Sequence, residues 1–482
     1  AVGWQAGDAI TTGQANVMVG DGSLGANETG GNNTAIGHFC LNNNTTDNAT
    51  AVGAHALRSN TTGGYNTAVG KSALTTNTTG ANNTAHGYQA LYLATTGSHN
   101  TGIGHNALGA CTTGTSNTAV GQGSGENITT GTNNTCVGRN SMGSLTTASN
   151  CTAFGQSSLF ANTTGISNTA YGAYSLDACT TGQENTAMGQ GALGSATTAS
   201  NNSAFGSNAL LSNVTGTSNC AFGHDCMEAN TGSNNTAYGF EAMKSNTTGE
   251  ENVAVGAYAG DANTTGAANT AVGYNALSSH SGTNNNTAIG RDCLNGVTSG
   301  ANNTGLGQGT GAFVTTGVNN LLLGMDAGRS GSPSGNITTG SDNVCLGDNS
   351  ISNLFCADTS ISSSDSRDKT DVTSFNIGLA WIEALRPVTY RWDRRTWYGT
   401  DAEPYGTPDG SKKRDRLHIG FLAQEALAVE KANGYGSSND DSLLVNLTDD
   451  GMSYGMKYER LVPILVNAIK ELSTRVTALE AG

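Results

Sequence analysis

The sequence predicts a mainly β protein, in which a parallel β-solenoid of 17-residue repeats is followed by a small α+β domain that ends in a coiled coil. Three observations predict this order. A five-residue phrase recurs at a step of 17 residues through most of the chain. The composition changes near residue 364, and apolar residues close to the C-terminus follow a heptad spacing. We therefore expect a repeat region over residues 1–363 and a second domain over residues 364–482.

Composition argues against several classes of function. The 482 residues include 68 Gly and 5 Pro, 12% of them are charged, and the formal net charge is -15. A disordered chain would have no reason to keep a fixed hydrophobic spacing, so the repeat outweighs the low-complexity composition. The acidic balance argues against nucleic acid as a partner. No segment approaches the ~20 apolar residues of a membrane span, so we expect no membrane insertion.

A glycine marks the phase of each repeat. The phrase Asn-Thr-Ala-Val-Gly occupies residues 66–70, 117–121 and 269–273. Its final glycine recurs from Gly3 to Gly324 in steps of 17 residues, with two steps of 16. The last step, to Gly347, is 23 residues long and contains Pro333, which predicts an inserted loop.

Two apolar positions keep their place relative to this marker glycine. The residue directly before it is apolar or aromatic, as at Val69 and Tyr171, and the residue four positions after it is Leu or Met, as at Leu74. Turn-forming runs such as residues 60–63 separate the phrases. The pattern predicts a short strand, a bend at glycine, a second short strand and a turn in each repeat. Stacked repeats would bury both apolar positions, aromatic members included, in one continuous column.

Stacking also predicts the shape and the assembly of this region. With strands ~4.8 Å apart, about 20 coils would form a rod on the order of 100 Å long. Rows of Asn and Thr are expected to form hydrogen-bonded ladders along the rod. The phrase is similar to the repeats of β-roll heads in trimeric adhesins, although those repeats are shorter. A thin column would bury more surface if three chains associated. This favours three side-by-side solenoids, with an intertwined triple β-helix as the alternative.

No chemistry is predicted within the repeats. No Asp, Glu or His recurs at a fixed phase, and the Gly-Gly-x-Gly-x-Asp pattern of calcium-binding repeats is absent. Nine of the ten cysteines lie in the repeats without metal-ligand spacing, and we expect them to be small buried residues, with disulfides between chains as the alternative. We therefore predict no metal and no cofactor.

The region after residue 364 has ordinary helix and strand signals. Residues 376–385 predict a helix that ends at Arg386-Pro387, residues 388–392 predict a strand, and residues 418–426 predict a strand that runs into a helix. A coiled coil is expected over residues 458–480. Its trimer seam, with spacings of 4, 3, 4 and 3 residues, consists of Leu465, Ile469, Leu472, Val476 and Leu479.

Four phrases in this region occur in a specific order. They are Ser364-Asp365-x-Arg367-x-Lys369, Leu385-Arg386-Pro387-Val388-x-Tyr390, Ile419-Gly420-Phe421-x-Ala423-Gln424-Glu425 and Ala468-Ile469-Lys470-Glu471-Leu472. Together they resemble the C-terminal intramolecular chaperone domain of phage tailspikes, tail fibres and endosialidases, which also occurs in some membrane-bound transcription factors. The resemblance implies a trimeric helper that nucleates folding of the preceding fibre and then cuts itself off.

The same resemblance implies roles for residues at the start of the domain. Ser364 would be the nucleophile, Lys369 the base, and the cut would fall at Ser364, between Ser364 and Asp365. A serine needs a base to act as a nucleophile, and Lys369 can serve if desolvation or the nearby Arg367 lowers its pKa. Burial on trimerisation would activate it. The alternative is a solvated linker that carries out no chemistry. Ser362, Ser363 and Ser366 are other hydroxyls that could act as the nucleophile.

These observations predict the shaft of a homotrimeric virion tail fibre or tailspike, assembled in the host cytoplasm. Its role would be host attachment through a surface glycan or receptor. Any enzyme activity would be limited to one autoproteolytic turnover. One alternative is a glycan-degrading tailspike whose enzymatic part lies outside this sequence, since such an enzyme needs a carboxylate pair that the repeats lack. Another is a bacterial surface adhesin.

Overall fold

The computed structural model describes residues 1–351, 372–395, 398–399, 403, 405–438, 441–447 and 454–481. They divide into two compact units. The first consists of Ala1–Arg329 and Asn336–Asp348, and the second of Ser330–Gly335 together with the chain from Asn349 onward. The predicted domain boundary at residues 363–364 lies outside the described residues.

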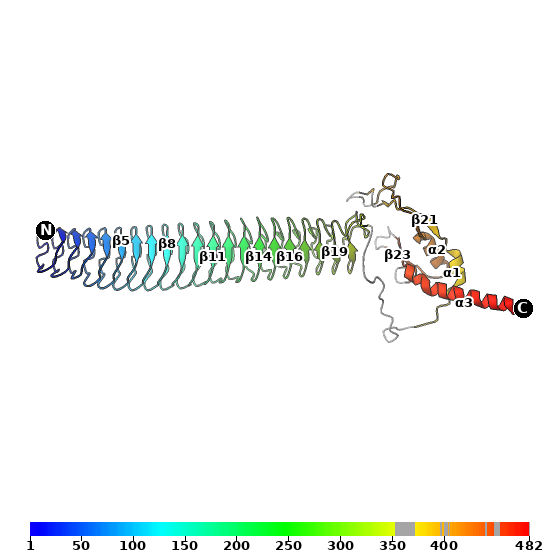
Figure 1. The fold of residues 1–482 in the computed structure, drawn as a ribbon, viewed down its shortest axis with the longest axis horizontal. Helices are drawn as coiled ribbons and strands as arrows, with labels where there is room; N and C mark the ends of the chain where they lie inside the picture. Colours follow the sequence, from blue (N-terminus) through cyan, green and yellow to red (C-terminus); the bar gives the residue numbers. More distant parts are fainter. Residues whose placement is uncertain are drawn as a thin grey trace. The chain divides into compact units, whose positions relative to one another are not determined.

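The first unit is a parallel β-solenoid, which confirms the predicted fold class (Figure 1). Each coil contributes one three-residue strand to a 20-stranded sheet, and each strand pairs in parallel with the next, as in Thr67↔Thr84 and Ala68↔Ala85. The strands are β1 (Val17–Val19), β2 (Thr34–Ile36), β3 (Thr50–Val52), β4 (Thr67–Val69), β5 (Thr84–His86), β6 (Thr101–Ile103), β7 (Thr118–Val120), β8 (Thr135–Val137), β9 (Thr152–Phe154), β10 (Thr169–Tyr171), β11 (Thr186–Met188), β12 (Ser203–Phe205), β13 (Cys220–Phe222), β14 (Thr236–Tyr238), β15 (Val253–Val255), β16 (Thr270–Val272), β17 (Thr287–Ile289), β18 (Thr304–Leu306), β19 (Leu321–Leu323) and β20 (Val344–Leu346).

The marker glycines allow the coils to stack closely at the bend after each strand. Gly121 has a φ of 134°, a conformation that side-chain-bearing residues rarely adopt. A Cβ added there would lie 2.6 Å from the carbonyl oxygen of Gly138 in the next coil. A similar clash recurs at the other bends from Gly3 to Gly307, so the glycine repeat follows from the distance between coils.

The predicted second strand of each repeat is wrong. The segment after the marker glycine is a series of turns, and the apolar residue four positions after the glycine has a left-handed backbone, with φ of 53° at Leu108 and 51° at Leu159. From Gly3 to Gly324 this position is Leu, Met or Gly, and never Val or Ile. A β-branched side chain is strongly disfavoured at positive φ, which explains the restriction.

The core is formed by the middle residue of each strand and by the Leu or Met after the bend. Ala119 and Leu108 are fully buried. The expected burial of the residue before the marker glycine is wrong, because Tyr171 is 55% and Tyr238 58% exposed. In a three-residue strand the first and third side chains point to the same side, opposite the middle one. The small middle alanine fits inside the coil, and its two neighbours point outward.

Asparagine ladders run through the interior of the rod, as predicted. The backbone N–H of Asn117 donates to Oδ1 of Asn100 at 3.0 Å, and its Nδ2 donates to the carbonyl of Gly131 at 2.8 Å. Threonine hydroxyls form a second ladder, in which Oγ1 of Thr112 donates to the carbonyl of Thr129 at 3.1 Å. Because buried amides need partners, each Asn stabilises the stacking of its coil on its neighbours.

Nine free cysteines occur among the described residues, and all except Cys220 are buried. Burial raises the pKa of Cys136 to about 12. These thiols therefore behave as small apolar residues, as predicted.

The second unit is a small α+β region with a C-terminal helix, as predicted. Its elements are α1 (Leu379–Ala384), β21 (Val388–Tyr390), β22 (His418–Gly420), α2 (Ala423–Ala432), β23 (Val445–Leu447), β24 (Tyr454–Met456), the short 3-10 helix η3 (Tyr458–Arg460) and α3 (Leu461–Glu480). Strands β21 and β22 pair antiparallel, as do β23 and β24. The trimer and the coiled coil stay predictions, because the structure contains one chain.

The left-handed position of the repeat gives a stability test. We expect Leu159→Ile to destabilise the rod more than Leu159→Met. Methionine occupies the same position in other coils and conserves volume, so its cost should stay below ~1.5 kcal/mol. Isoleucine adds strain of about 1–3 kcal/mol because it is β-branched at positive φ. Thermal unfolding followed by circular dichroism measures both variants, and equal shifts in Tm would contradict the explanation.

Candidate functional site

The predicted self-cleavage residues lie outside the described part of the chain. This applies to the catalytic pair Ser364 and Lys369, to the cleavage residue Asp365 and to the supporting Arg367. After the predicted junction, the described part of the second unit resumes at residue 372 and contains all residues of the other three phrases.

The second and third phrases pair with each other. Val388 in β21 lies opposite Gly420 in β22, and Tyr390 lies opposite His418. Arg386, just before β21, donates a hydrogen bond from Nε to Oε2 of Glu425 at 3.2 Å. This hydrogen bond lowers the pKa of the Glu425 carboxyl. The pair is exposed, so it contributes more to alignment than to stability.

Gly420 is required by a close approach of the C-terminal segment. The hydroxyl of Tyr458 in η3 accepts a hydrogen bond from the backbone N–H of Phe421 at 3.1 Å. A Cβ at Gly420 would clash with that hydroxyl. The third phrase therefore fits against the segment that leads into α3.

Helix α3 holds the chain that follows the predicted cleavage junction. Nδ2 of Asn467 donates to the carbonyls of Phe375 at 2.7 Å and Ile377 at 3.1 Å. Oε2 of Glu471 accepts a hydrogen bond from the N–H of Leu379 at 3.1 Å, so a carboxylate satisfies the first turn of α1. Sequence reasoning missed both anchors. The sequence phrase that contains Glu471 was the one feature that could have pointed to an anchor in this helix.

Helix α3 has a buried face and an exposed face. Leu461, Ile464 and Ala468 are buried within the second unit. The predicted seam residues lie on the exposed face, with exposed fractions between 43% at Leu465 and 81% at Leu479. The seam, consisting of Leu465, Ile469, Leu472, Val476 and Leu479, is therefore an uncovered apolar stripe in the single chain.

A buried carboxylate organises the segment between the two helices. Glu430 in α2 is fully buried and accepts hydrogen bonds from the N–H of Val445 at 3.1 Å and from the hydroxyl of Ser442 at 2.9 Å. It also accepts one from the N–H of Leu444. A buried carboxylate needs such donors to offset desolvation. Glu430 therefore fixes the start of β23 against α2.

Comparison with protein families finds a match within the second unit. Residues 364–435 match the family model of the chaperone of endosialidase. The match confirms the predicted resemblance and includes the junction together with α1, β21, β22 and α2. No curated protein matches the chain. A parallel β-solenoid followed by this chaperone domain is consistent with a tail-fibre or endosialidase-like architecture.

An aromatic row lies on the surface of the rod, in the first unit. The rings of His224 and Phe240 are stacked with their centroids 5.6 Å apart. Edge-to-face contacts extend the row, with centroid distances of 5.5 Å from Phe240 to Tyr258 and 5.9 Å from Tyr258 to Tyr274. These residues follow their marker glycines by one or two positions, so they lie across the bend from the strands. Phe240 and Tyr274 are exposed. This aromatic row (residues 224, 240, 258 and 274) offers an apolar surface.

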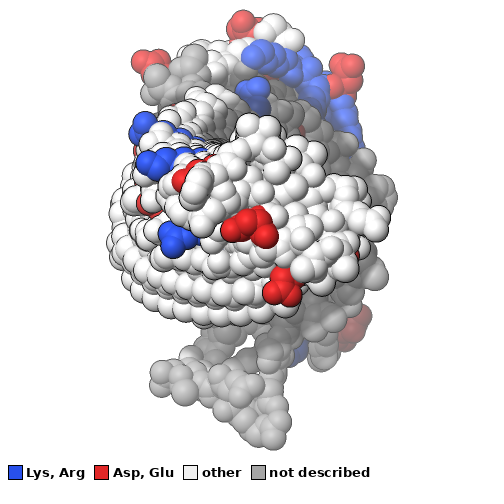
Figure 2. Space-filling view, turned by 90° about the vertical axis from the view of Figure 1, so that its left-hand side faces the viewer, with Lys and Arg blue, Asp and Glu red and all other residues white. Residues whose placement is uncertain are grey.

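Charged residues are sparse on the rod, and most of the surface seen from its N-terminal end is uncharged (Figure 2). One ionic cluster lies beside the aromatic row. The ammonium group of Lys244 lies 3.0 Å from Asp225, 3.1 Å from Glu241 and 3.6 Å from Glu228. Hydrogen bonds with Asp225 and Glu241 raise the pKa of Lys244. The three carboxylates surround one ammonium group. A glycosidase instead places two carboxyl groups on either side of the scissile bond, one as acid and one as base or nucleophile.

Within the described ranges, no group of three His, Cys, Asp or Glu side chains could hold a metal ion. None of the described helices has the length and apolar character of a membrane span.

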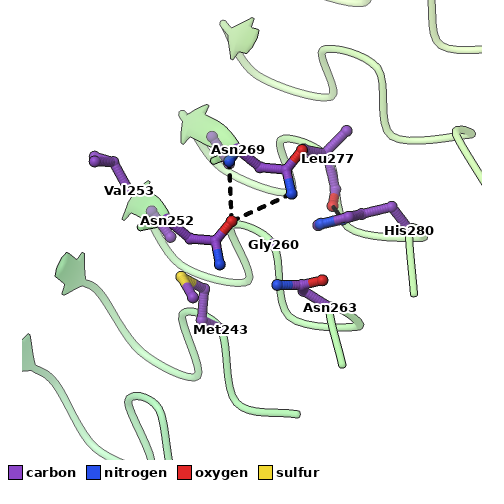
Figure 3. Close-up of a pocket in the computed structure, with 10 residues that line it drawn as sticks. Met243, Asn252, Val253, Gly260, Asn263, Asn269, Leu277 and His280 are labelled. Carbon is purple, nitrogen blue, oxygen red and sulfur yellow. Dashed lines mark hydrogen bonds between the residues drawn. The ribbon is translucent and has the colours of Figure 1, made fainter. Parts of the chain in front are cut away.

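A small cavity interrupts the core where Gly260 replaces the usual Leu or Met (Figure 3). Some other coils with this glycine have a branched residue near it three positions later, such as Ile128 after Gly125 and Val314 after Gly311, but here that residue is Asn263. The cavity has a volume of about 10 Å³, which is near the size of one water. His280 of the next coil lines it.

His280 occupies a position that is often Asn in other coils, and it is almost fully buried. Its Nδ1 donates to the carbonyl of Leu277 at 2.7 Å, because a carbonyl can only accept. Its Nε2 is buried without a hydrogen-bond partner. Burial lowers the pKa of His280 below its usual value. No charged side chain lines the cavity to balance an imidazolium ion.

This burial predicts a local pH dependence. Unfolded His has a pKa near 6.5, so below about pH 6.5 the unfolded coils bind more protons than the folded ones and stability falls. We expect hydrogen exchange in residues 257–290, corrected for intrinsic rates, to accelerate between pH 7 and pH 5. His280→Asn should remove this acceleration, whereas the control His105→Asn, at an exposed position, should keep it. The explanation fails if both variants respond to pH as the natural chain does.

Proposed function

We propose that this protein is the shaft of a homotrimeric virion tail fibre or tailspike, assembled in the host cytoplasm, whose chaperone domain aligns three chains and then releases itself. The family match carries the proposal, because it begins at Ser364, where the predicted catalytic pair begins. The exposed seam of α3 supports self-association, since an apolar stripe at heptad spacing gains stability when other helices cover it.

The proposed cleavage is nucleophilic and needs neighbouring copies. The hydroxyl of Ser364 attacks the carbonyl of the Ser364–Asp365 bond while Lys369 takes its proton. A serine that attacked its own carbonyl would form a strained β-lactone, so we assign the nucleophile to a second copy. The amine of Asp365 leaves with a proton, and water hydrolyses the ester to restore the hydroxyl and a new carboxyl terminus.

Two anchors support a link between assembly and this reaction. Asn467 and Glu471 fasten residues 375–379 to α3, the helix that carries the seam. Association of three such helices would therefore bring three junctions together. Crowding of Arg367 and Lys369 from several copies would lower the pKa of Lys369. Cleavage would then follow assembly.

The repeats explain why such a rod needs a folding helper. Strands of nearly identical sequence pair out of register at little local cost. Parallel stacking also nucleates slowly and exposes edges that aggregate. A clamp at one end aligns three chains, and the coils can then add in order from that end.

We expect the purified natural chain to separate into fragments near residues 1–364 and 365–482 under denaturing conditions. Ser364→Ala and Lys369→Gln should remain full-length, because one lacks the nucleophile and the other lacks the base. Ser366→Ala is the matched control and should still be cut. Intact mass measures all four proteins. A natural chain that remains full-length in a folded trimer would leave a trimerisation domain without a peptidase.

We also propose that the aromatic row contacts a host surface glycan. Sugar rings present C–H faces that pack on aromatic side chains, and the polar groups of the adjoining Lys244 cluster can bind hydroxyls. A glycan-degrading activity finds less support. The carboxylates that gather in this cluster converge on Lys244.

The glycan proposal predicts that Phe240→Ala combined with Tyr274→Ala will reduce adsorption of the fibre to host cells by at least about tenfold, since each ring contributes on the order of 1 kcal/mol. Tyr65→Ala is the control, because Tyr65 is exposed and belongs to none of the ring stacks in the described residues. Adsorption is measured with labelled fibre and a capsule-deficient strain. Unchanged adsorption of the double variant would exclude the row as the receptor site.

A further inference from the structure

The outward face of the long sheet has an unusual composition. This strand face consists of the first and third residues of β1–β20. The first is usually Thr, and the third is apolar or aromatic in every strand except at His86. None of the residues in β1–β20 is Lys, Arg, Asp or Glu. The charged residues of the rod lie on the other sides of each coil.

The strand face is uncovered in the single chain. Ile36, Ile103 and Tyr238 are among its exposed third residues. Purely parallel sheets are normally covered on both faces, and here only the inner face packs against the core. The face also continues without interruption over the 20 strands. A long apolar surface without charge is typical of an interface.

We propose that copies of this chain pack against one another through the strand face along the length of the rod, an inference that rests on the proposed homotrimer. Each copy carries a formal net charge of -15, so identical chains repel wherever their acidic residues meet. The strand face is the apolar surface that lacks such residues. Association of the α3 seams brings identical chains together in parallel, and the same face of each chain can then turn inward.

The size of the face suits this role. If the third residue of each of the 20 strands loses roughly 50 Å², the face of one chain buries on the order of 1,000 Å², which reaches the size of a specific interface. Stacked pairs such as Phe205–Phe222 and Phe222–Tyr238, with centroids 4.2 Å and 5.2 Å apart, would supply its aromatic contacts. The aromatic row lies across the bend and would stay on the outside.

The core favours three side-by-side rods over an intertwined triple β-helix. Ala119, Leu108 and Leu159 are fully buried within one chain. An intertwined helix would build its core from three chains and would leave such residues exposed in each. Because every coil closes its own core, the copies have only outer surfaces to share.

The test places a single reactive thiol on or off the strand face of the full-length protein. Ile103→Cys lies on the face, and the control Thr96→Cys lies in the same coil but outside the strand; both natural residues are exposed in one chain. Cys220, which also lies on the face, and Cys356 are replaced by Ser in both proteins. Circular dichroism and light scattering confirm the fold and the number of copies.

A short bismaleimide should link Ile103→Cys into covalent pairs, and Thr96→Cys should stay unlinked while it reacts fully with a bulky hydrophilic maleimide. A trimer in which Ile103→Cys stays unlinked and reacts fully would overturn the face assignment and leave the homotrimer intact. A monomer would overturn both proposals. A cross-linked trimer of full-length chains would support the proposed interface and would contradict only the proposed self-cleavage.

Discussion

The rod depends on one geometric constraint: the chain must return to the same place, one strand spacing further along, after each coil. At the bend this leaves no room for a Cβ between Gly121 and Gly138. Inside the coil it places each Asn next to the Asn of the neighbouring coil, so that their amides bond in series. The strand register, the alanine core and the glycine period all follow from this stacking.

Much of the rod could be predicted from sequence, because stacking places like residues on like. The period, the parallel sheet and the Asn ladders were visible as columns of identical residues. The burial of the residue before the marker glycine was predicted wrongly. A three-residue strand gives no alternation from which to choose the inward side, and a bulky apolar residue looked more like core than Ala did. The left-handed Leu position was missed as well, although the absence of Val and Ile from it was a usable signal.

The second unit was predictable in a different way, because four short sequence phrases resembled a known family and no periodicity was needed. Their spacing in the sequence gave no hint that Arg386 would meet Glu425 or that Tyr458 would lie over Gly420. The anchors Asn467 and Glu471 bind backbone groups about 90 residues earlier, as at Leu379. A backbone hydrogen-bonding group, donor or acceptor, has no side-chain signature, so contacts of this kind cannot be read from a single sequence. The pair Ser364 and Lys369 lies outside the described residues and stays a prediction.

The closed coil has a consequence for how the length of the rod can evolve. Each coil bonds only to its two neighbours, and adjacent coils present nearly identical surfaces to them. Duplicating or deleting one 17-residue unit therefore rejoins two compatible surfaces and changes the length by about 4.8 Å. Near-identical repeats in a gene recombine readily in this way. Because all copies come from the same gene, each such event would change every chain of an assembly equally, and the reach of the rod could be tuned without redesigning its ends.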